Sequence, residues 1–423
     1  MSKRQAYFDN ASTTPLDPRV LKAMMPYLEG EYGNPSNLYA MGRHARAAIA
    51  EAGMTIAKLL GCRPDEFIFT GSATEADNLA VVGAARAHRA AGNRIIISSL
   101  EHKGIMAACD ALEKEGFEII KLPVGKDGIV SSDEVKKALN EKTIIVSVTM
   151  ADSETGTLQP IEKISAVVKS FRGDKPLPYF HTDASQAAAY ADVNVEKLGV
   201  DMMTLSAHKL RGPKGIGGLF VRRGVKLSPV VYGGGQQGRL RSGTENVPGI
   251  VGFGVAMGLN EKSKRAEGAK VKKMRDALEK GIFKSIDKVV LNGHPTERLP
   301  NFLNISILDV EGESLLLELD EHGIMINTGS ACNSESLEPS YVLTALGNPY
   351  EFVHGSVRFT LGTDTTMADV DYVLEHLPKI VERLRKISPL DLSMDQKKAM
   401  SDPRAFIGNQ TPHFLRKKQI KAK

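Results

Sequence analysis

The stretch MTLSAHKLRGPKGIGGLFV, residues 203–221, joins an apolar run to a lysine and a glycine-rich loop. Lys209 directly follows the run, and a lysine at the end of a buried strand is partly desolvated, which lowers its pKa and frees the neutral amine for imine formation. Ser206 and His208 offer donors for an anion, and the glycines leave space for a flat group. Taken alone, the stretch is explained more simply by a solvated lysine beside a glycine-rich turn. Its meaning therefore depends on what the neighbouring strands carry.

Short β-branched runs alternate with helix-like segments from about residue 65 to residue 250. Strands are predicted at 67–70, 95–98, 143–149, 179–183, 202–206 and 218–221. Helices are predicted between them at 74–91, 103–115 and 131–140. This alternation is typical of an α/β domain with a mainly parallel sheet, in which ligands bind at the carboxyl ends of the strands.

The pattern changes after residue 250. Helices are predicted at 252–282, 311–322 and 367–387, with strands at 301–308 and 356–362, which indicates a smaller α+β domain. We expect residues 15–250 to form the large domain, and residues 1–14 and 251–387 to form the small one. The polar segment 388–423 has little periodicity, so we expect a mobile tail rather than a docking segment.

Composition excludes several classes of protein. A chain of 423 residues is too long for one ordinary hydrophobic core, so more than one domain is expected. Hydrophobic residues make up 42% and charged residues 25%, as in an average soluble protein. The net charge of +5 is spread along the chain, which does not suggest direct nucleic-acid binding. No apolar run approaches the roughly 20 residues needed to span a bilayer, and the N-terminus lacks the apolar core of a signal peptide. We therefore expect neither membrane insertion nor secretion.

The three cysteines, Cys62, Cys109 and Cys332, are widely scattered and form no C-x-x-C motif or Cys/His cluster. Structural zinc and a self-contained iron–sulfur site are therefore not expected, and no metal site is predicted. Free thiols in a chain without a signal peptide indicate the reducing cytoplasm. Cys62 and Cys109 are interpreted as small packed residues.

Polar residues follow the other predicted strands as well. The turn after strand 67–70 contains Ala73 and Thr74, small enough for backbone N–H groups to approach an anion at a helix N-terminus, although an ordinary helix cap at Ser72 or Thr74 explains it equally simply. His102 follows strand 95–98, where a structural or surface histidine is the simpler interpretation. Asp183 ends strand 179–183, where it could cap a helix or hold a cation.

These residues gain meaning as a set. A phosphate-binding turn, a strand-end carboxylate and a strand-end lysine on one sheet edge are the groups that hold pyridoxal 5'-phosphate (PLP). The lysine carries the aldehyde, the carboxylate keeps the pyridine nitrogen protonated, and the turn binds the phosphate. The sequence therefore predicts a PLP enzyme.

The chain also resembles a known family, the NifS/IscS-type cysteine desulfurases, which are fold-type I PLP enzymes of the class V aminotransferase group. The matching stretches occur in family order over about residues 6–385. They are YFDNASTTP, YGNPSN, TGSATEADNLA, SSLEHKGI, HTDASQ, SAHKLRGPKGIGGL, GGGQQGRLRSGTENVPGIVG, GSACNSESLEPSYVL and SVRFTLGTDTT. The resemblance implies the PLP-dependent transferase fold type I.

The resemblance further implies roles for individual residues of the cofactor site. Lys209 is similar to the Schiff-base lysine, Asp183 to the partner of the pyridine nitrogen, and Gln186 to the residue that binds the phenolic oxygen. His102 is similar to the histidine that stacks on the ring and acts as an acid or base. The phosphate-binding positions of the family match Ala73, Thr74, Ser206, His208 and, from a second subunit, Thr244, so a homodimer is implied.

For the substrate, the resemblance implies that Arg358 binds the carboxylate, with Asn34 nearby. Ser153 stands where the family usually has an asparagine that contacts the cofactor or substrate, and a hydroxyl is shorter with only one donor. The family has Asn-Asn where this chain has Asp152-Ser153.

The resemblance implies conversion of L-cysteine to L-alanine, with the sulfur held as a persulfide on Cys332, in the stretch TGSACNSESLEP. The acceptor would be an iron–sulfur scaffold protein or a carrier for tRNA thiolation. Two alternatives stay open: another class V PLP enzyme, such as a selenocysteine lyase or an aminotransferase, and a PLP-binding scaffold without catalysis.

Overall fold

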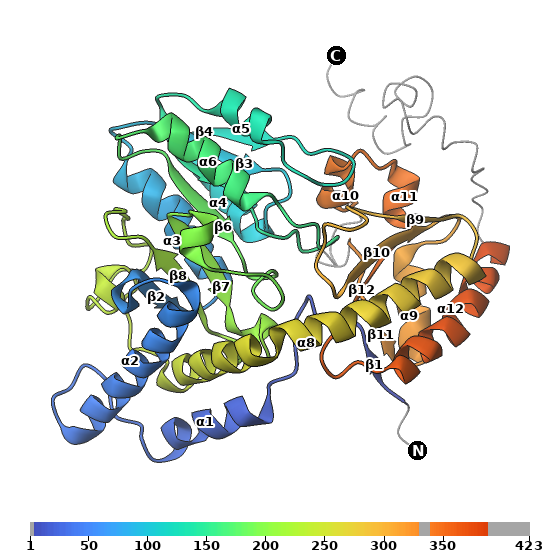
Figure 1. The fold of residues 1–423 in the computed structure, drawn as a ribbon, viewed down its shortest axis with the longest axis horizontal. Coiled ribbons are helices and arrows are strands. Elements are labelled where there is room, and N and C mark those ends of the chain that lie inside the picture. Colours follow the sequence, from blue (N-terminus) through green and yellow to red (C-terminus); the bar gives the residue numbers. More distant parts are fainter. Residues whose placement is uncertain (1–3, 330–338, 388–423) are drawn as a thin grey trace.

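The computed structural model describes residues 4–329 and 339–387. The predictions for Cys332 and for the segment 388–423 lie outside these described residues. Figure 1 shows two units, each built on its own sheet and joined by a long helix that runs beneath both.

The larger unit is built on a seven-stranded sheet. In spatial order its strands are β2 (Phe67–Thr70), β8 (Gly217–Val221), β7 (Met202–Ser206), β6 (Tyr179–Asp183), β5 (Thr143–Ser147), β3 (Arg94–Ser98) and β4 (Glu118–Leu122). Only β8 is antiparallel to its neighbours. The mainly parallel sheet is thus confirmed, with all six predicted strands present; edge strand β4 was not predicted.

Both faces of this sheet are covered, because successive residues of each strand point to opposite sides. Ile95 and Ile97 pack against α3 (Ala73–Ala87) and α4 (Lys103–Lys114) in one core cluster. Ile96 belongs to a second cluster on the other face, with α2 (Ala40–Leu60), α6 (Ile161–Arg172) and the start of α8 (Val247–Ser285). Shorter helices α1 (Pro18–Glu29), α5 (Ser132–Ala138) and α7 (Val195–Leu198) complete this unit.

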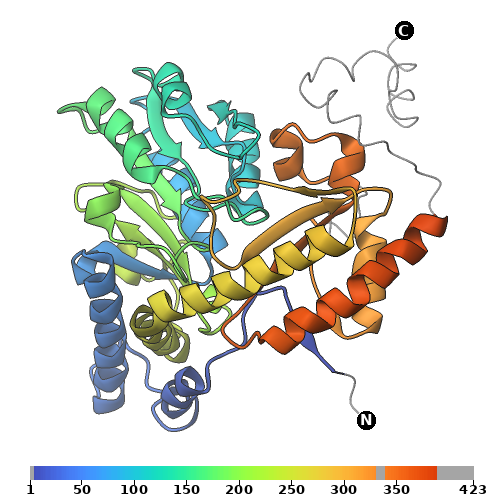
Figure 2. The same cartoon turned by 45° about the vertical axis from the view of Figure 1, so that its right-hand side comes forward.

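The smaller unit has a three-stranded antiparallel sheet in the order β12 (Ser356–Thr360), β10 (Phe302–Ile307) and β9 (Val289–Leu291). In Figure 2, the second half of α8 and α12 (Met367–Ile387) lie side by side against it. A two-stranded pair, β1 (Ala6–Tyr7) with β11 (Ile324–Met325), and three helices, α9 (Gly312–Glu321), α10 (Tyr341–Ala345) and α11 (Tyr350–His354), complete the unit. The predicted helix 367–387 is confirmed, with Thr366 and Asp369 exchanging capping hydrogen bonds.

Helix α8 contributes to both cores. Ile250 and Phe253 belong to the cluster under the seven-stranded sheet, and Leu278 and Ile282 belong to the cluster of the smaller unit. The predicted limit between domains at residues 250/251 stays a prediction, and it falls within the first turn of a helix that the two cores share. Among the described residues, no helix is long and apolar enough to cross a membrane.

Candidate active site

A cavity of about 390 Å³ lies at the carboxyl ends of the strands of the large sheet. Of the residues predicted for the site, those that line it are Ala73, Thr74, His102, Ser153, Asp183, Gln186, Ser206, His208, Lys209 and Arg358. Asn34 and Thr244 do not line the cavity of their own chain. The fold thus brings together ten side chains whose association was inferred from sequence.

Lys209 occupies the short turn that follows β7. Its Nζ donates to the carbonyl oxygen of Ser12 at 2.8 Å and to that of Ala11. The N-terminal segment therefore lies against the lysine, and Thr14 fixes it there through hydrogen bonds to the His208 carbonyl. Burial, followed by the charge of Lys209, lowers the pKa of His208 to about 4, so its imidazole is neutral at neutral pH.

The anion-binding turn lies between β2 and α3. Ser72 caps the 15-residue helix α3 by accepting a hydrogen bond from the Glu75 N–H at 3.1 Å, which confirms Ser72 rather than Thr74 as the cap. Arg241 pairs with Glu75 at 2.8 Å and offsets the carboxylate in the first turn of the helix. The positive end of the helix dipole, with Ala73 and Thr74, is therefore available to a phosphate.

A glycine brings this turn against the strand next to Lys209. A side chain on Gly217 would place its first carbon 2.6 Å from the carbonyl carbon of Ser72 and 2.7 Å from the amide nitrogen of Ala73. Only glycine permits this approach, so the turn sits beside the end of β7. This close fit, with lysine, carboxylate and helix N-terminus on one cavity, suits a phosphorylated pyridine aldehyde such as PLP.

Asp183 ends β6 and is 7% exposed. Its Oδ1 accepts from the Ser185 N–H at 2.8 Å, while Gln186 donates to the Ala11 carbonyl at 2.9 Å. Burial, then the charge of Asp183, raises the pKa of the fully buried Asp77 well above its ordinary value. Burial also disfavours the charged form of His181 and lowers the pKa of its imidazole to about 4. Both groups beneath Asp183 therefore favour their uncharged forms.

His102 is the cap of α4. Its Nδ1 accepts from the Gly104 N–H at 3.1 Å, which leaves Nε2 to carry a proton. The preceding residue, Glu101, is fully buried and accepts from the Ser98 hydroxyl at 2.6 Å and the Thr149 N–H at 2.7 Å. Burial raises the pKa of Glu101 to about 8. The imidazole thus lies on a turn that hydrogen bonds to β3 and to the loop after β5 hold in place.

Arg358 comes from β12 of the smaller unit. Its guanidinium donates to the Asp9 carboxylate at 2.7 Å, the Ser12 hydroxyl at 3.0 Å and the Ser153 carbonyl at 2.7 Å. Asn327 donates to the same Asp9 and Ser12 groups. Sequence reasoning missed Asp9 and Ser12, although both lie in the quoted stretch YFDNASTTP.

The departure at Asp152-Ser153 has a structural counterpart. Asp152 is fully buried and accepts from the N–H groups of Glu154 at 2.8 Å and Thr155 at 3.0 Å, which forms the turn after β5. Ser153 lines the cavity and offers Arg358 its backbone carbonyl. Residue 153 thus positions the arginine through its main chain, a role that its side chain does not determine.

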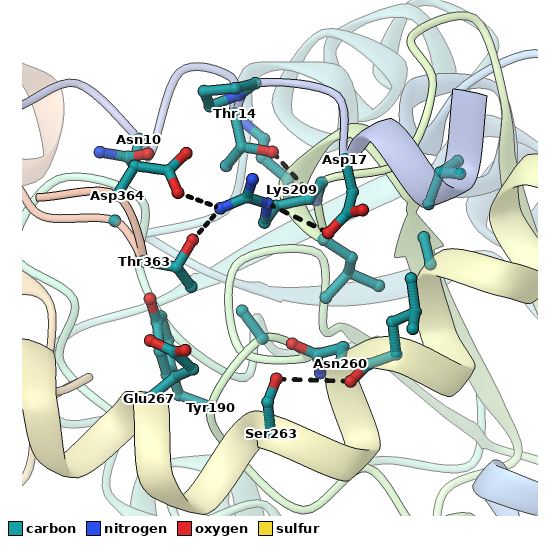
Figure 3. A pocket seen from close by; sticks show the side chains of 18 of the residues that line it. Asn10, Thr14, Asp17, Tyr190, Lys209, Asn260, Ser263, Glu267, Thr363 and Asp364 are labelled. Atoms are coloured by element: carbon teal, nitrogen blue, oxygen red, sulfur yellow. Dashed lines mark hydrogen bonds and ion pairs between the residues drawn. The ribbon is translucent and has the colours of Figure 1, made fainter. Parts of the chain in front are cut away.

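A second cavity of about 390 Å³ lies behind the lysine, between the N-terminal segment, α8 and residues 362–364 (Figure 3). Lys209 and Gln186 line both cavities. Arg211 crosses the second one and pairs with Asp364 at 2.8 Å, with Thr363, and with Asp17 at 3.8 Å. Since this arginine already has acidic partners, the second cavity needs no ligand to balance its charge.

The two cysteines within the described residues are poor nucleophiles. Burial raises the pKa of Cys62 and of Cys109 to about 12. A thiol with so high a pKa carries almost no thiolate at neutral pH. Both fit the prediction of packed small residues, and no group of three or more potential metal ligands occurs among residues 4–329 and 339–387.

Comparison with known proteins shows which family has this arrangement. The profile of the family described as aminotransferase class-V matches residues 6–373. The chain belongs to this family. It is 47% identical over 387 residues to the cysteine desulfurase IscS of Dictyoglomus turgidum, covering 92% of this chain and 97% of that one.

Solved structures give the same result. The chain resembles a NifS-like protein with a TM-score of 0.84 and 33% identity, over 90% of this chain and 100% of that one. It also resembles SspA in complex with cysteine, with a TM-score of 0.74 and 34% identity, over 86% and 100% of the two chains. The predicted fold-type I class, the PLP cofactor and the resemblance to cysteine desulfurases are confirmed.

Proposed function

We propose that the protein is a PLP-dependent cysteine desulfurase that converts L-cysteine to L-alanine and holds the sulfur as a persulfide on Cys332. The observation that carries this proposal is one cavity that unites Lys209, Asp183, the N-terminus of α3 and Arg358. Relatives with full-length similarity bear the name cysteine desulfurase.

The residues around the cavity divide the work of binding. Lys209 would carry the cofactor aldehyde, Asp183 would hold the pyridine nitrogen, and Ala73 and Thr74 would bind the phosphate with Ser206 and His208. When bound, PLP withdraws electrons from the α-carbon of an amino acid attached to it. Gln186 would bind the phenolic oxygen, Asn34 would lie near the substrate, and Ser153 would contact the cofactor or the substrate.

Protein groups would then move the protons. The amine of Lys209 would remove the α-proton of the substrate and return a proton to the product. Arg358 binds the substrate carboxylate through its planar fork, which Asp9 and the Ser153 carbonyl orient. Nε2 of His102 is available as an acid or base toward the substrate.

Sulfur transfer balances without an external oxidant. The Cys332 thiolate attacks the sulfur of L-cysteine, an S–S bond forms, and the Cβ–S bond breaks. The electron pair of the broken bond stays with the carbon skeleton, which takes up a proton and leaves as alanine. One L-cysteine and one thiol thus give one alanine and one persulfide.

The acceptor and the assembly belong to the same proposal. The persulfide would pass to an iron–sulfur scaffold protein or to a tRNA-thiolation carrier in the cytoplasm. Thr244 is exposed in the single chain, which supports a homodimer in which a second copy presents this residue to the phosphate.

Mass spectrometry after treatment with L-cysteine tests the proposal. We expect one additional sulfur atom on Cys332 in the wild-type protein and in the Cys62→Ala control, and none in Cys332→Ala. Near-wild-type release of alanine from L-cysteine by Cys332→Ala would instead favour a lyase of the selenocysteine lyase type. A protein that binds PLP but releases no alanine would be a scaffold.

A further inference from the structure

Glu154 is a buried carboxyl group to which the proposed reaction assigns no role. It lines the same cavity as Lys209 and Arg358 and is 8% exposed. Its backbone is fixed by Asp152, which accepts from its N–H, and by Asn304 of β10, which donates to its carbonyl at 3.1 Å. The side chain therefore starts from a rigid turn between the two sheets.

Two segments that lie far from Glu154 in sequence meet at its carboxylate. Ser340 donates its hydroxyl to Oε2 at 2.5 Å and, as the cap of α10, also accepts from the Leu343 N–H at 3.1 Å. Gly329 lies close to both groups: a first side-chain carbon there would lie 2.7 Å from the same Oε2 and 2.8 Å from the Ser340 Cβ. Ser340 is thus bonded to this oxygen atom, and Gly329 lies close to it.

The charges around this carboxylate come from three directions. Asp152 lies on its own turn, Arg358 on β12 and Lys103 on α4, and the last two favour the ionised form. Burial opposes them and raises the pKa of Glu154 to about 7. A carboxylate that accepts a hydroxyl hydrogen bond makes a stronger bond than a neutral acid does. Glu154 can therefore hold Ser340 firmly when it is ionised.

We propose that Glu154 is the positioning residue for the sulfur-accepting thiol, because its carboxylate binds Ser340 and lies against Gly329, and the sequence places Cys332 between these two residues. This inference rests on the proposed function, since it assumes that Cys332 receives the sulfur. Ser340 is the partner through which Glu154 acts. The glycine at 329 is required because any side chain would enter the space between the two.

Two rates measured on the same PLP-loaded protein separate this role from general support of the cavity. Exchange of the α-hydrogen of L-alanine in D₂O, followed by NMR, needs Lys209 and the cofactor but not a thiol. Single-turnover gain of sulfur on Cys332, followed by mass spectrometry, needs both. The variants are Ser340→Ala, Glu154→Gln and the control Ser131→Ala, which removes the cap of α5 at a residue that does not line the cavity.

We expect Ser340→Ala to slow sulfur gain about tenfold and Glu154→Gln about threefold, because the amide keeps an acceptor but loses the charge. Exchange of the α-hydrogen should stay within about twofold of wild type in both. Ser131→Ala should change neither rate.

Equal sulfur gain in wild type and both variants would overturn the positioning role. So would a parallel loss of both rates, because Glu154 would then support the whole cavity. If the wild-type protein gains no sulfur on Cys332 while exchanging the α-hydrogen, the proposed function is wrong and this inference falls with it.

Discussion

The two walls of the cavity differ in how they are built. One wall consists of strand ends of a single sheet: the turn after β2, Asp183 at the end of β6, and Lys209 after β7. The other is assembled from segments far apart in sequence, so that Arg358 contacts Asp9 across 349 positions and Ser340 contacts Glu154 across 186. We call these the sheet wall and the docked wall.

The two walls differ in function as well as in construction. Backbone ladders fix the sheet wall, which suits a cofactor that must stay in place through every turnover. The docked wall depends on the contact between the two units, and it holds the groups proposed for the substrate carboxylate and for the thiol. Substitutions in the sheet wall should therefore stop all chemistry, and those in the docked wall should affect single steps.

The largest effect is expected in the sheet wall. Replacing Lys209 by alanine should slow α-hydrogen exchange of L-alanine at least about a thousandfold, because the group that moves the proton is removed. NMR in D₂O measures this rate. Lys214 is an exposed lysine of the same loop, and the control Lys214→Ala should exchange the α-hydrogen at the wild-type rate. Substantial exchange in Lys209→Ala would contradict the assignment of Lys209 as the group that moves the α-proton.

A smaller effect is expected for substrate binding by the docked wall. Arg358→Lys loses the planar fork and should raise KM for L-cysteine about tenfold, with kcat changed less. Steady-state release of alanine measures both constants. Arg19→Lys, at an exposed arginine that pairs with the buried Asp17, should leave them unchanged. An unchanged KM in Arg358→Lys would place the carboxylate elsewhere.

The sheet wall could be predicted from sequence because its residues follow the strands directly. Lys209, Asp183 and the turn at Ala73 and Thr74 are each found by locating a strand and looking at its carboxyl end. Even so, the individual roles required the resemblance to a family, since each residue alone has an ordinary structural explanation.

The docked wall could not be predicted in this way, because nothing local marks its contacts. Asp9 precedes no predicted element, and its place beside Arg358 follows only from how the N-terminal segment returns to β12. Glu154 directly follows Asp152-Ser153, where the chain departs from the family, and its partner Ser340 lies 186 positions away. Edge strand β4 was missed for a related reason, since its exposed Glu118 and Lys121 weaken the apolar pattern.

The docked wall should also respond to pH through Glu154, whose pKa burial raises to about 7. As the pH rises through this value, the acid ionises and its hydrogen bond from Ser340 becomes charge-assisted. The ratio of sulfur gain in wild type to that in Glu154→Gln should therefore rise about two- to threefold between about pH 6 and about pH 8. Because both proteins contain the other titrating groups, the effect of those groups on the rate cancels in the ratio. A flat ratio would contradict the charge-dependent role.

A further effect, on stability rather than on a rate, is expected near the sheet wall. Burial raises the pKa of Glu101 from 4.5 to about 8, so the folded protein keeps a proton that the unfolded chain has already released. The free energy of unfolding should therefore fall as pH rises within this window, by about 1.4 kcal/mol per pH unit for this group. Denaturant unfolding should show a shallower fall in Glu101→Gln than in the exposed control Glu113→Gln. Equal slopes would mean that Glu101 is ionised in the folded state.

The division between the walls is tested most directly by measuring α-hydrogen exchange and sulfur gain on one preparation of Cys332→Ala. The account predicts exchange of the α-hydrogen of L-alanine at close to the wild-type rate, because the sheet wall is intact, and no sulfur retained on the protein after L-cysteine. Loss of both α-hydrogen exchange and sulfur gain would contradict it, and so would sulfur retained on the protein without Cys332.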